Sequence, residues 1–167
     1  MKTSLHEVYH GQVRDLYNAE TQQLKQLTEM ETAASSDELK ASISKARQQT
    51  QNHCARLKKI CNAHGIPAEG EECKAMKGLI SEAKHHMEET QTGPVLDAVM
   101  IASLNRFEHY EIAGYGVARA FAKALNLKDD ADLLDETLDE VSSMDDTLTK
   151  IATGGFFGKG INDAAIA

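Results

Sequence analysis

Apolar residues recur every three or four positions through the first part of the chain, the spacing that gathers side chains on one face of an α-helix. The stripe passes through Val13, Leu16, Tyr17, Leu24 and Leu27. The pattern breaks at residues 35–38, where Ser-Ser-Asp-Glu offers an N-cap followed by acidic residues that favour the first turn of a helix. We therefore predict a helix over residues 4–32 and a second helix that begins after this break.

The same periodicity returns in four further segments, and glycine and proline mark two of the boundaries between them. Turn signals lie at residues 65–70 and at Gly93-Pro94, where proline suits the first position of the next helix. The segment after Pro94 is apolar nearly all round, which is typical of a central, buried helix. The segments predict helices that end near residues 64, 89, 126 and 152.

Two of the connections between the long helices are short, and one is long. The links at residues 33–36 and 127–129 leave room only for antiparallel neighbours. The middle link can cross the bundle from end to end and carries the short helix over residues 71–89. Two hairpins joined by one long crossover are typical of ferritin-like proteins. We therefore expect an all-α fold, a ferritin-like four-helix bundle whose crossover carries a short fifth helix.

The last residues of the chain, GGFFGKGINDAAIA, are rich in glycine and lack the periodicity of the helices. We expect residues 1–153 to form the bundle and residues 154–167 to form a flexible tail. The aromatic pair Phe156-Phe157 within this tail is expected to dock on the bundle or on a second subunit.

Composition and charge exclude several classes of function. The 167 residues fit one domain, and the formal charge of -8 is opposite to the basic surface that binds a phosphate backbone. No uncharged run approaches the roughly 20 residues that cross a bilayer, and the N-terminus lacks the features of a secretory signal. We therefore expect a cytoplasmic protein that binds neither nucleic acid nor membrane, with its three cysteines reduced.

Four glutamates and one histidine lie where the helical pattern predicts an apolar neighbourhood. Glu20 falls on the stripe of the first helix, and His53 replaces an apolar residue in the second. Glu108 and Glu111 lie on the most apolar helix, and Glu140 borders the stripe of the last one. Each lies near the middle of its helix, and the midpoints of helices joined by short links face each other. We therefore expect these five groups to converge inside the bundle.

A metal centre is the chemistry that this convergence favours. Several carboxylates in a low-dielectric interior repel one another, and a divalent cation keeps them ionised. Oxygen donors with one imidazole suit iron or manganese. We therefore predict that Glu20, His53, Glu108, Glu111 and Glu140 bind one or two such ions. For each carboxylate taken alone, an ion pair with lysine or arginine is the alternative.

Other polar residues carry weaker signals. His109 points about 100° around the helix from Glu108, so we expect it to be packed or hydrogen-bonded in the core rather than to bind a metal. Asp130, like the other acidic residues near helix ends, is expected to face solvent. Tyr17 and Tyr115 are candidates to lie near the centre and to tune its reactivity.

Several motifs together resemble the YciF-type proteins, a bacterial ferritin-like family associated with stress. The motifs are Leu16-Tyr17-Asn18-Ala19-Glu20, Glu108-His109-Tyr110-Glu111 and Glu136-Thr137-Leu138-Asp139-Glu140, together with residues 73–80, CKAMKGLI. The resemblance covers most of the chain and implies a ferritin-like bundle with a fifth helix, a homodimer, and a dimetal site. It assigns Glu20, Glu108, Glu111 and Glu140 as ligands, with His53 in the second helix.

Two positions depart from the pattern of a complete dimetal site. The family usually has a glutamate where this chain has Gln49, and Ser143 stands where a Glu-x-x-His pair would have its histidine. Two functions therefore stay open. One is a non-haem iron or manganese protein with a partly degenerate site, with or without catalysis. The other is a non-catalytic, dimeric helical module with a vestigial site that acts through protein partners.

Overall fold

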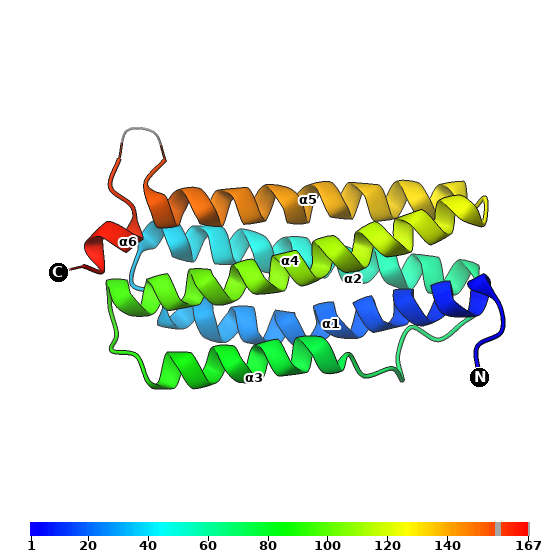
Figure 1. Ribbon diagram of the computed structural model, residues 1–167, viewed down its shortest axis with the longest axis horizontal. Coiled ribbons are helices and arrows are strands. Elements are labelled where there is room, and N and C mark those ends of the chain that lie inside the picture. The colour runs from blue at the N-terminus through cyan, green and yellow to red at the C-terminus, as the bar shows by residue number, and fades with distance from the viewer. Residues whose placement is uncertain (156–157, 167) are drawn as a thin grey trace.

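The computed structural model describes residues 1–155 and 158–166 of the chain. These residues form six helices: α1 (Leu5–Ala33), α2 (Asp37–Ala63), α3 (Lys74–Glu88), α4 (Pro94–Ala124), α5 (Lys128–Thr153) and α6 (Ile161–Ala164). The four long helices lie side by side, and the shorter α3 lies outside them (Figure 1). The predicted all-α class is confirmed.

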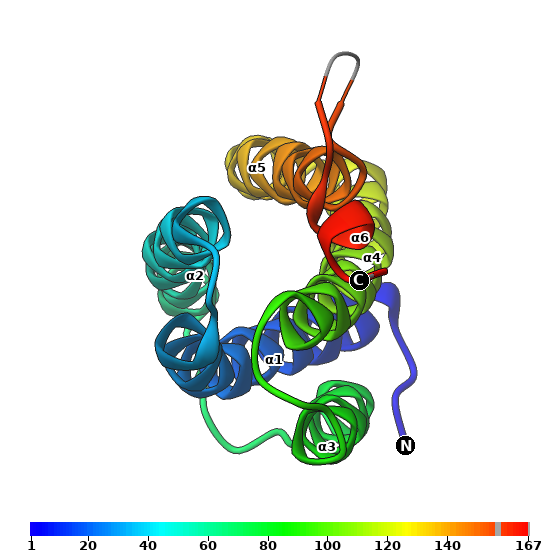
Figure 2. The ribbon, with the colours of Figure 1, turned by 90° about the vertical axis from the view of Figure 1, so that its left-hand side faces the viewer.

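The long helices pair as two antiparallel hairpins. The first hairpin is α1 with α2 and the second is α4 with α5, and contacts between α1 and α4 and between α2 and α5 close the bundle. The crossover between α2 and α4 runs the length of the bundle (Figure 1) and places α3 against α1 and α4 (Figure 2). Because two hairpins joined by one long crossover define the ferritin-like arrangement, the predicted fold is confirmed.

Local sequence signals set most helix ends. The Ser36 hydroxyl accepts a hydrogen bond from the Leu39 N–H, and Pro94 occupies the first turn of α4. Some boundaries differ from the expected positions: α3 begins at Lys74 rather than at residue 71, and α5 begins at Lys128 rather than after it. The chain turns earlier, at Asn126, whose φ of 59° lies in the left-handed region that asparagine tolerates.

The apolar core consists of two clusters in opposite halves of the bundle. One cluster includes Leu27, Leu39 and Leu148, and the other includes Leu16 and Leu57. The buried polar side chains at the middle of the long helices lie between these clusters: Glu20, His53, Glu108 and Glu111. The apolar clusters thus hold a polar layer at mid-height, away from both ends of the bundle.

The described part of the C-terminal segment lies against the end of the bundle. The short α6 contacts α4 and α5, and Ile161 packs on the core cluster that contains Leu27. Phe156 and Phe157 lie outside the described residues, and the division into a bundle and a tail stays a prediction. Within residues 1–155 and 158–166, no helix has an apolar stretch long enough to span a bilayer.

Candidate metal centre

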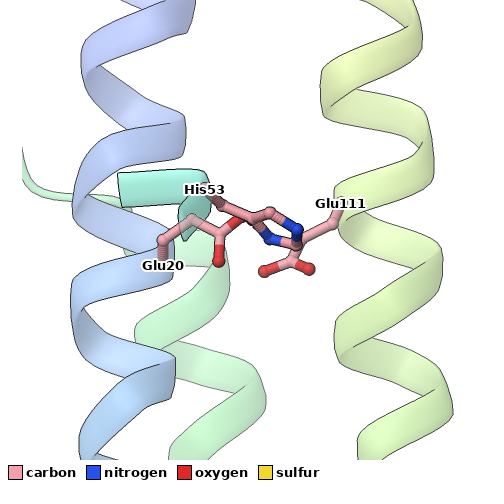
Figure 3. Close-up of side chains that lie close together, drawn as sticks. All are labelled: Glu20, His53 and Glu111. Atoms are coloured by element: carbon pink, nitrogen blue, oxygen red, sulfur yellow. Dashed lines mark hydrogen bonds and ion pairs between the residues drawn. The ribbon is translucent and has the colours of Figure 1, made fainter. Parts of the chain in front are cut away.

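Three side chains from three helices converge at the middle of the bundle. Glu20 projects from α1, His53 from α2 and Glu111 from α4, and the three point toward one another (Figure 3). One ligand atom of each lies within 4.8 Å of the others, and all three residues are buried. Two carboxylates and one imidazole at this separation form a donor set that suits a divalent transition-metal ion.

Two oxygens of this group have no hydrogen-bond partner among the described residues. Glu20 Oε1 accepts a hydrogen bond from the Tyr115 hydroxyl at 2.5 Å and lies 3.1 Å from His53 Nδ1. In contrast, Glu20 Oε2 and Glu111 Oε1 are buried and unpartnered. A buried oxygen without a partner costs about 1–3 kcal/mol, and more when it is charged. A cation between these carboxylates would remove that cost, so the residues fit a metal ion.

Burial and mutual repulsion control the ionisation of the central carboxyls. Burial raises the pKa of Glu111 well above its ordinary value, and the charges of Glu20 and Glu108 raise it further. Burial, followed by the charges of Glu20 and Asp145, raises the pKa of Glu108 in the same direction. Carboxylates that resist ionisation in this way are those that a cation would hold in their charged form.

Glu108 lies beside the three-residue group, against a small pocket. This cavity has a volume of about 10 Å³ and is lined by His53, Glu108, Glu111 and the side chain of Gln49, with apolar residues closing it. A space of this size accommodates about one water-sized particle. Gln49 therefore faces the same space as the carboxylates, although it offers a neutral amide in place of the glutamate expected of the family.

Glu140 faces the centre through His53 but is held by Arg56. Its two oxygens accept hydrogen bonds from Arg56, Nη1 to Oε2 at 2.6 Å and Nη2 to Oε1 at 3.1 Å. The Arg56 hydrogen bonds lower the pKa of Glu140, and His53 contributes to the same shift. The structure therefore brings Glu20, His53 and Glu111 into one group and places Glu140 outside it, in a bidentate ion pair.

His53 lies between two carboxylates. Its Nδ1 faces Glu20, and its Nε2 lies 2.9 Å from Glu140 Oε2. Burial lowers the pKa of His53, but the Glu20 and Glu140 carboxylates outweigh that effect and raise it. The imidazole thus has one nitrogen directed toward the centre and the other toward the Arg56-bound carboxylate.

Sequence reasoning missed Arg56. This residue lies one helical turn after His53 and bonds not only Glu140 but also Glu136 Oε1, at 2.5 Å. The signal was available, because a basic residue three positions after a buried histidine shares its face of the helix. Of the two tyrosines proposed to lie near the centre, Tyr115 contacts Glu20, whereas the Tyr17 hydroxyl faces Glu69 on the crossover.

Two other sequence expectations are wrong. His109 is not a core residue, since its side chain is 68% exposed and faces Asp145 on α5. Asp130 is not a solvated charge, because it is buried and accepts a hydrogen bond from the Tyr9 hydroxyl. His64 Nε2 lies 2.6 Å from the same Asp130 oxygen. Both errors arise from long-range neighbours that a helical period does not encode.

Known proteins resemble this chain over nearly its whole length. Residues 4–164 match the family model described as a domain of unknown function, DUF892. Protein YciF from Escherichia coli (strain K12) is 33% identical over 165 residues, which are 98% of this chain and 99% of that protein.

Two solved structures share the fold. The crystal structure of the E. coli stress protein YciF matches with a TM-score of 0.85 and 33% identity over 90% of this chain and 94% of that one. YcfI from Rhodopseudomonas palustris, a protein described with a suggested structural role, matches with a TM-score of 0.87 and 31% identity, over 90% and 96% of the two chains. The chain therefore belongs to the DUF892 family of YciF-type proteins.

Proposed function

We propose that this protein binds iron or manganese at the middle of its bundle, through Glu20, His53 and Glu111, with Glu108 beside them. The observation that carries the proposal is the pair of buried, unpartnered oxygens, Glu20 Oε2 and Glu111 Oε1, in a group whose ligand atoms lie within 4.8 Å of one another. Gln23 Oε1 and Gln26 Oε1 are also buried without a partner, but those are neutral amide oxygens, and a buried carboxylate oxygen costs more to leave unsatisfied when it is charged.

Glu20, His53 and Glu111 would hold the ion in a site that is buried from solvent. When bound, an iron or manganese ion would supply a Lewis acid with accessible redox states. Tyr115 hydrogen-bonds the Glu20 oxygen that faces His53 and so fixes the orientation of that carboxylate. The stress association of the E. coli relative supports such a role, because non-haem metal centres suit reactions with oxidants.

Metal analysis of the purified protein tests this proposal. The protein is purified without chelator beside a variant that carries Glu20→Ala and Glu111→Ala, and iron and manganese are measured by mass spectrometry. We expect metal in the wild-type protein and its loss from the variant, with helical circular dichroism retained in both. Equal, near-zero metal in the two proteins would overturn the proposal.

A second candidate function is a non-catalytic structural module that forms a homodimer. The role suggested for the R. palustris relative favours it, as does the replacement of two expected ligands, since Gln49 offers only an amide and Ser143 is exposed. Light scattering coupled to gel filtration tests the homodimer on which this second candidate depends. A dimer that persists unchanged when metal is removed supports the structural role, and a monomer excludes the homodimer.

A further inference from the structure

The ion pair of Arg56 and Glu140 lies where a second metal ion of a carboxylate centre would find its ligands. In a complete site of this architecture, two of the helices each supply a glutamate and a histidine one turn apart. Here α5 offers Glu140, but both its oxygens already accept hydrogen bonds from Arg56. Arginine keeps its charge at any ordinary pH. A permanent cation therefore already neutralises this carboxylate.

The surroundings of Arg56 show that the ion pair is built into the fold. Its guanidinium also bonds the Glu136 carboxylate at 2.5 Å and the hydroxyl of the buried Thr137 at 3.3 Å. The Arg56 side chain is 15% exposed, far less than a lysine or arginine that reaches freely into solvent. Three residues of α5 thus fix a single side chain of α2 beside the centre.

The other side of Glu140 reaches the centre through an imidazole. Glu140 Oε2 lies 2.9 Å from His53 Nε2, while His53 Nδ1 faces Glu20. A histidine that binds a metal through one nitrogen commonly donates its other N–H to a carboxylate, which fixes the orientation of the ring. Glu140 occupies the position of such a carboxylate rather than that of a ligand.

Space also limits the number of ions. The pocket against His53, Glu108 and Glu111 has a volume of about 10 Å³, room for about one water-sized particle beside these side chains. Building on the function proposed above, we infer that the centre takes one divalent cation per chain. In this arrangement the Arg56 guanidinium stands in for the second cation, and Glu140 positions His53 without binding the metal.

Counting bound ions tests the inference and separates it from the metal-binding proposal itself. Chelator-stripped protein is dialysed against Mn²⁺, and the ion is counted per chain. We expect one ion. Two ions per chain would overturn the inference but leave the proposed function standing, whereas no ion would overturn both.

The role of Glu140 is tested by its removal. Glu140→Ala is expected to keep one Mn²⁺ per chain but to weaken its binding about 10- to 100-fold, as the loss of a carboxylate that orients a ligating histidine does. The d–d spectrum of bound Co²⁺ should keep its shape, because the ligands are unchanged. The matched control is Asp139→Ala, at the exposed position next to Glu140 on α5, which should leave the affinity unchanged. Complete loss of binding in Glu140→Ala, or an altered Co²⁺ spectrum, would show that Glu140 is a ligand.

The role of Arg56 is tested by freeing Glu140. Arg56→Gln removes the built-in cation, and we expect the count at saturating Mn²⁺ to rise from one ion toward two. Arg47→Gln is the matched control. Arg47 also lies on α2 and forms an ion pair with a glutamate of a neighbouring helix, Glu31 of α1, but away from the centre. A count that stays at one in Arg56→Gln, in a protein with unchanged circular dichroism, would overturn the stand-in role of Arg56.

Discussion

Two buried carboxylates of α4, Asp97 near its start and Glu111 near its middle, are equally inaccessible, each 1% exposed. Asp97 accepts three hydrogen bonds from the link between α1 and α2: from the N–H and hydroxyl of Ser35 at 2.8 and 2.6 Å and from the N–H of Ser36 at 2.9 Å. Glu111, in contrast, has an oxygen without a hydrogen-bond partner among the residues that the structure describes. The Asp97 carboxylate therefore stabilises the link between α1 and α2, whereas the unpartnered Glu111 oxygen stabilises no other part of the described fold.

The comparison shows that burial alone does not mark a functional site. What distinguishes the two carboxylates is whether donors of the fold satisfy their oxygens. Three donors offset the cost of burying Asp97 and tie the first hairpin to α4. At Glu111 the cost remains in the metal-free protein, and our account assigns its compensation to a cation. The same chemical change should therefore have opposite effects at the two positions.

The largest expected effect is at the satisfied carboxylate. Asp97→Asn places an amide NH₂ where the Ser35 and Ser36 donors need an acceptor, so we expect a loss of about 2–3 kcal/mol in the free energy of unfolding. Urea denaturation of the metal-free protein measures it. Asp129→Asn, at an exposed position in the first turn of α5, is the control and should change stability by less than about 0.5 kcal/mol. Equal effects of the two variants would refute the structural role of Asp97.

The same substitution at the unsatisfied carboxylate should stabilise the metal-free protein. Glu111→Gln removes a buried charge from a cluster of like charges and supplies an NH₂ group close to Glu20. We expect a gain of about 1–2 kcal/mol in the metal-free protein at pH 8, measured by the same denaturation. The matched control is Glu82→Gln, at an exposed position of α3. A loss of stability in Glu111→Gln would mean that the fold itself requires the Glu111 charge.

A smaller effect is expected when the pH is changed, because the free energy of unfolding of the metal-free protein should fall gradually as the pH rises. The folded-state pKa values of Glu108 and Glu111 are raised above the ordinary 4.5, so the folded chain binds more protons than the unfolded chain. Their stabilising contribution is complete below pH 4.5 and is lost as the pH rises through the raised values, by up to about 1.4 kcal/mol per pH unit for each proton. Thermal melts of metal-free wild-type protein should show this loss, and Glu111→Gln should reduce it. Identical pH profiles in the two proteins would contradict the assignment.

The fold was predictable because its signals are local. The apolar stripes, the Ser36 cap and Pro94 mark the helices, and the lengths of the links select the ferritin-like connection. Parts of the centre were predictable for the same reason, since Glu20 and Glu111 interrupt apolar faces at mid-helix. The pairing of Asp97 with the first link was not predictable, because its donors lie about 60 residues away in the chain.

The arrangement around Glu140 shows the same limit. Periodicity places Glu140 beside an apolar stripe, but whether its neighbour is a cation of the chain or a bound metal depends on how α2 and α5 are aligned. Arg56 and Glu140 are 84 residues apart, and the spacing within either helix carries no information about the other. Buried Asp130, which bonds Tyr9 from the opposite end of the chain, was misjudged for the same reason.

The most direct test of the account is a crystal of the wild-type protein soaked in Mn²⁺ and measured at the manganese absorption edge. The account predicts one anomalous difference peak per chain in the bundle, bounded by Glu20, His53 and Glu111, and its absence from crystals of Glu111→Gln. A bundle without any peak, or peaks confined to the acidic surface, would contradict the claim that these unsatisfied carboxylates exist to hold a metal ion.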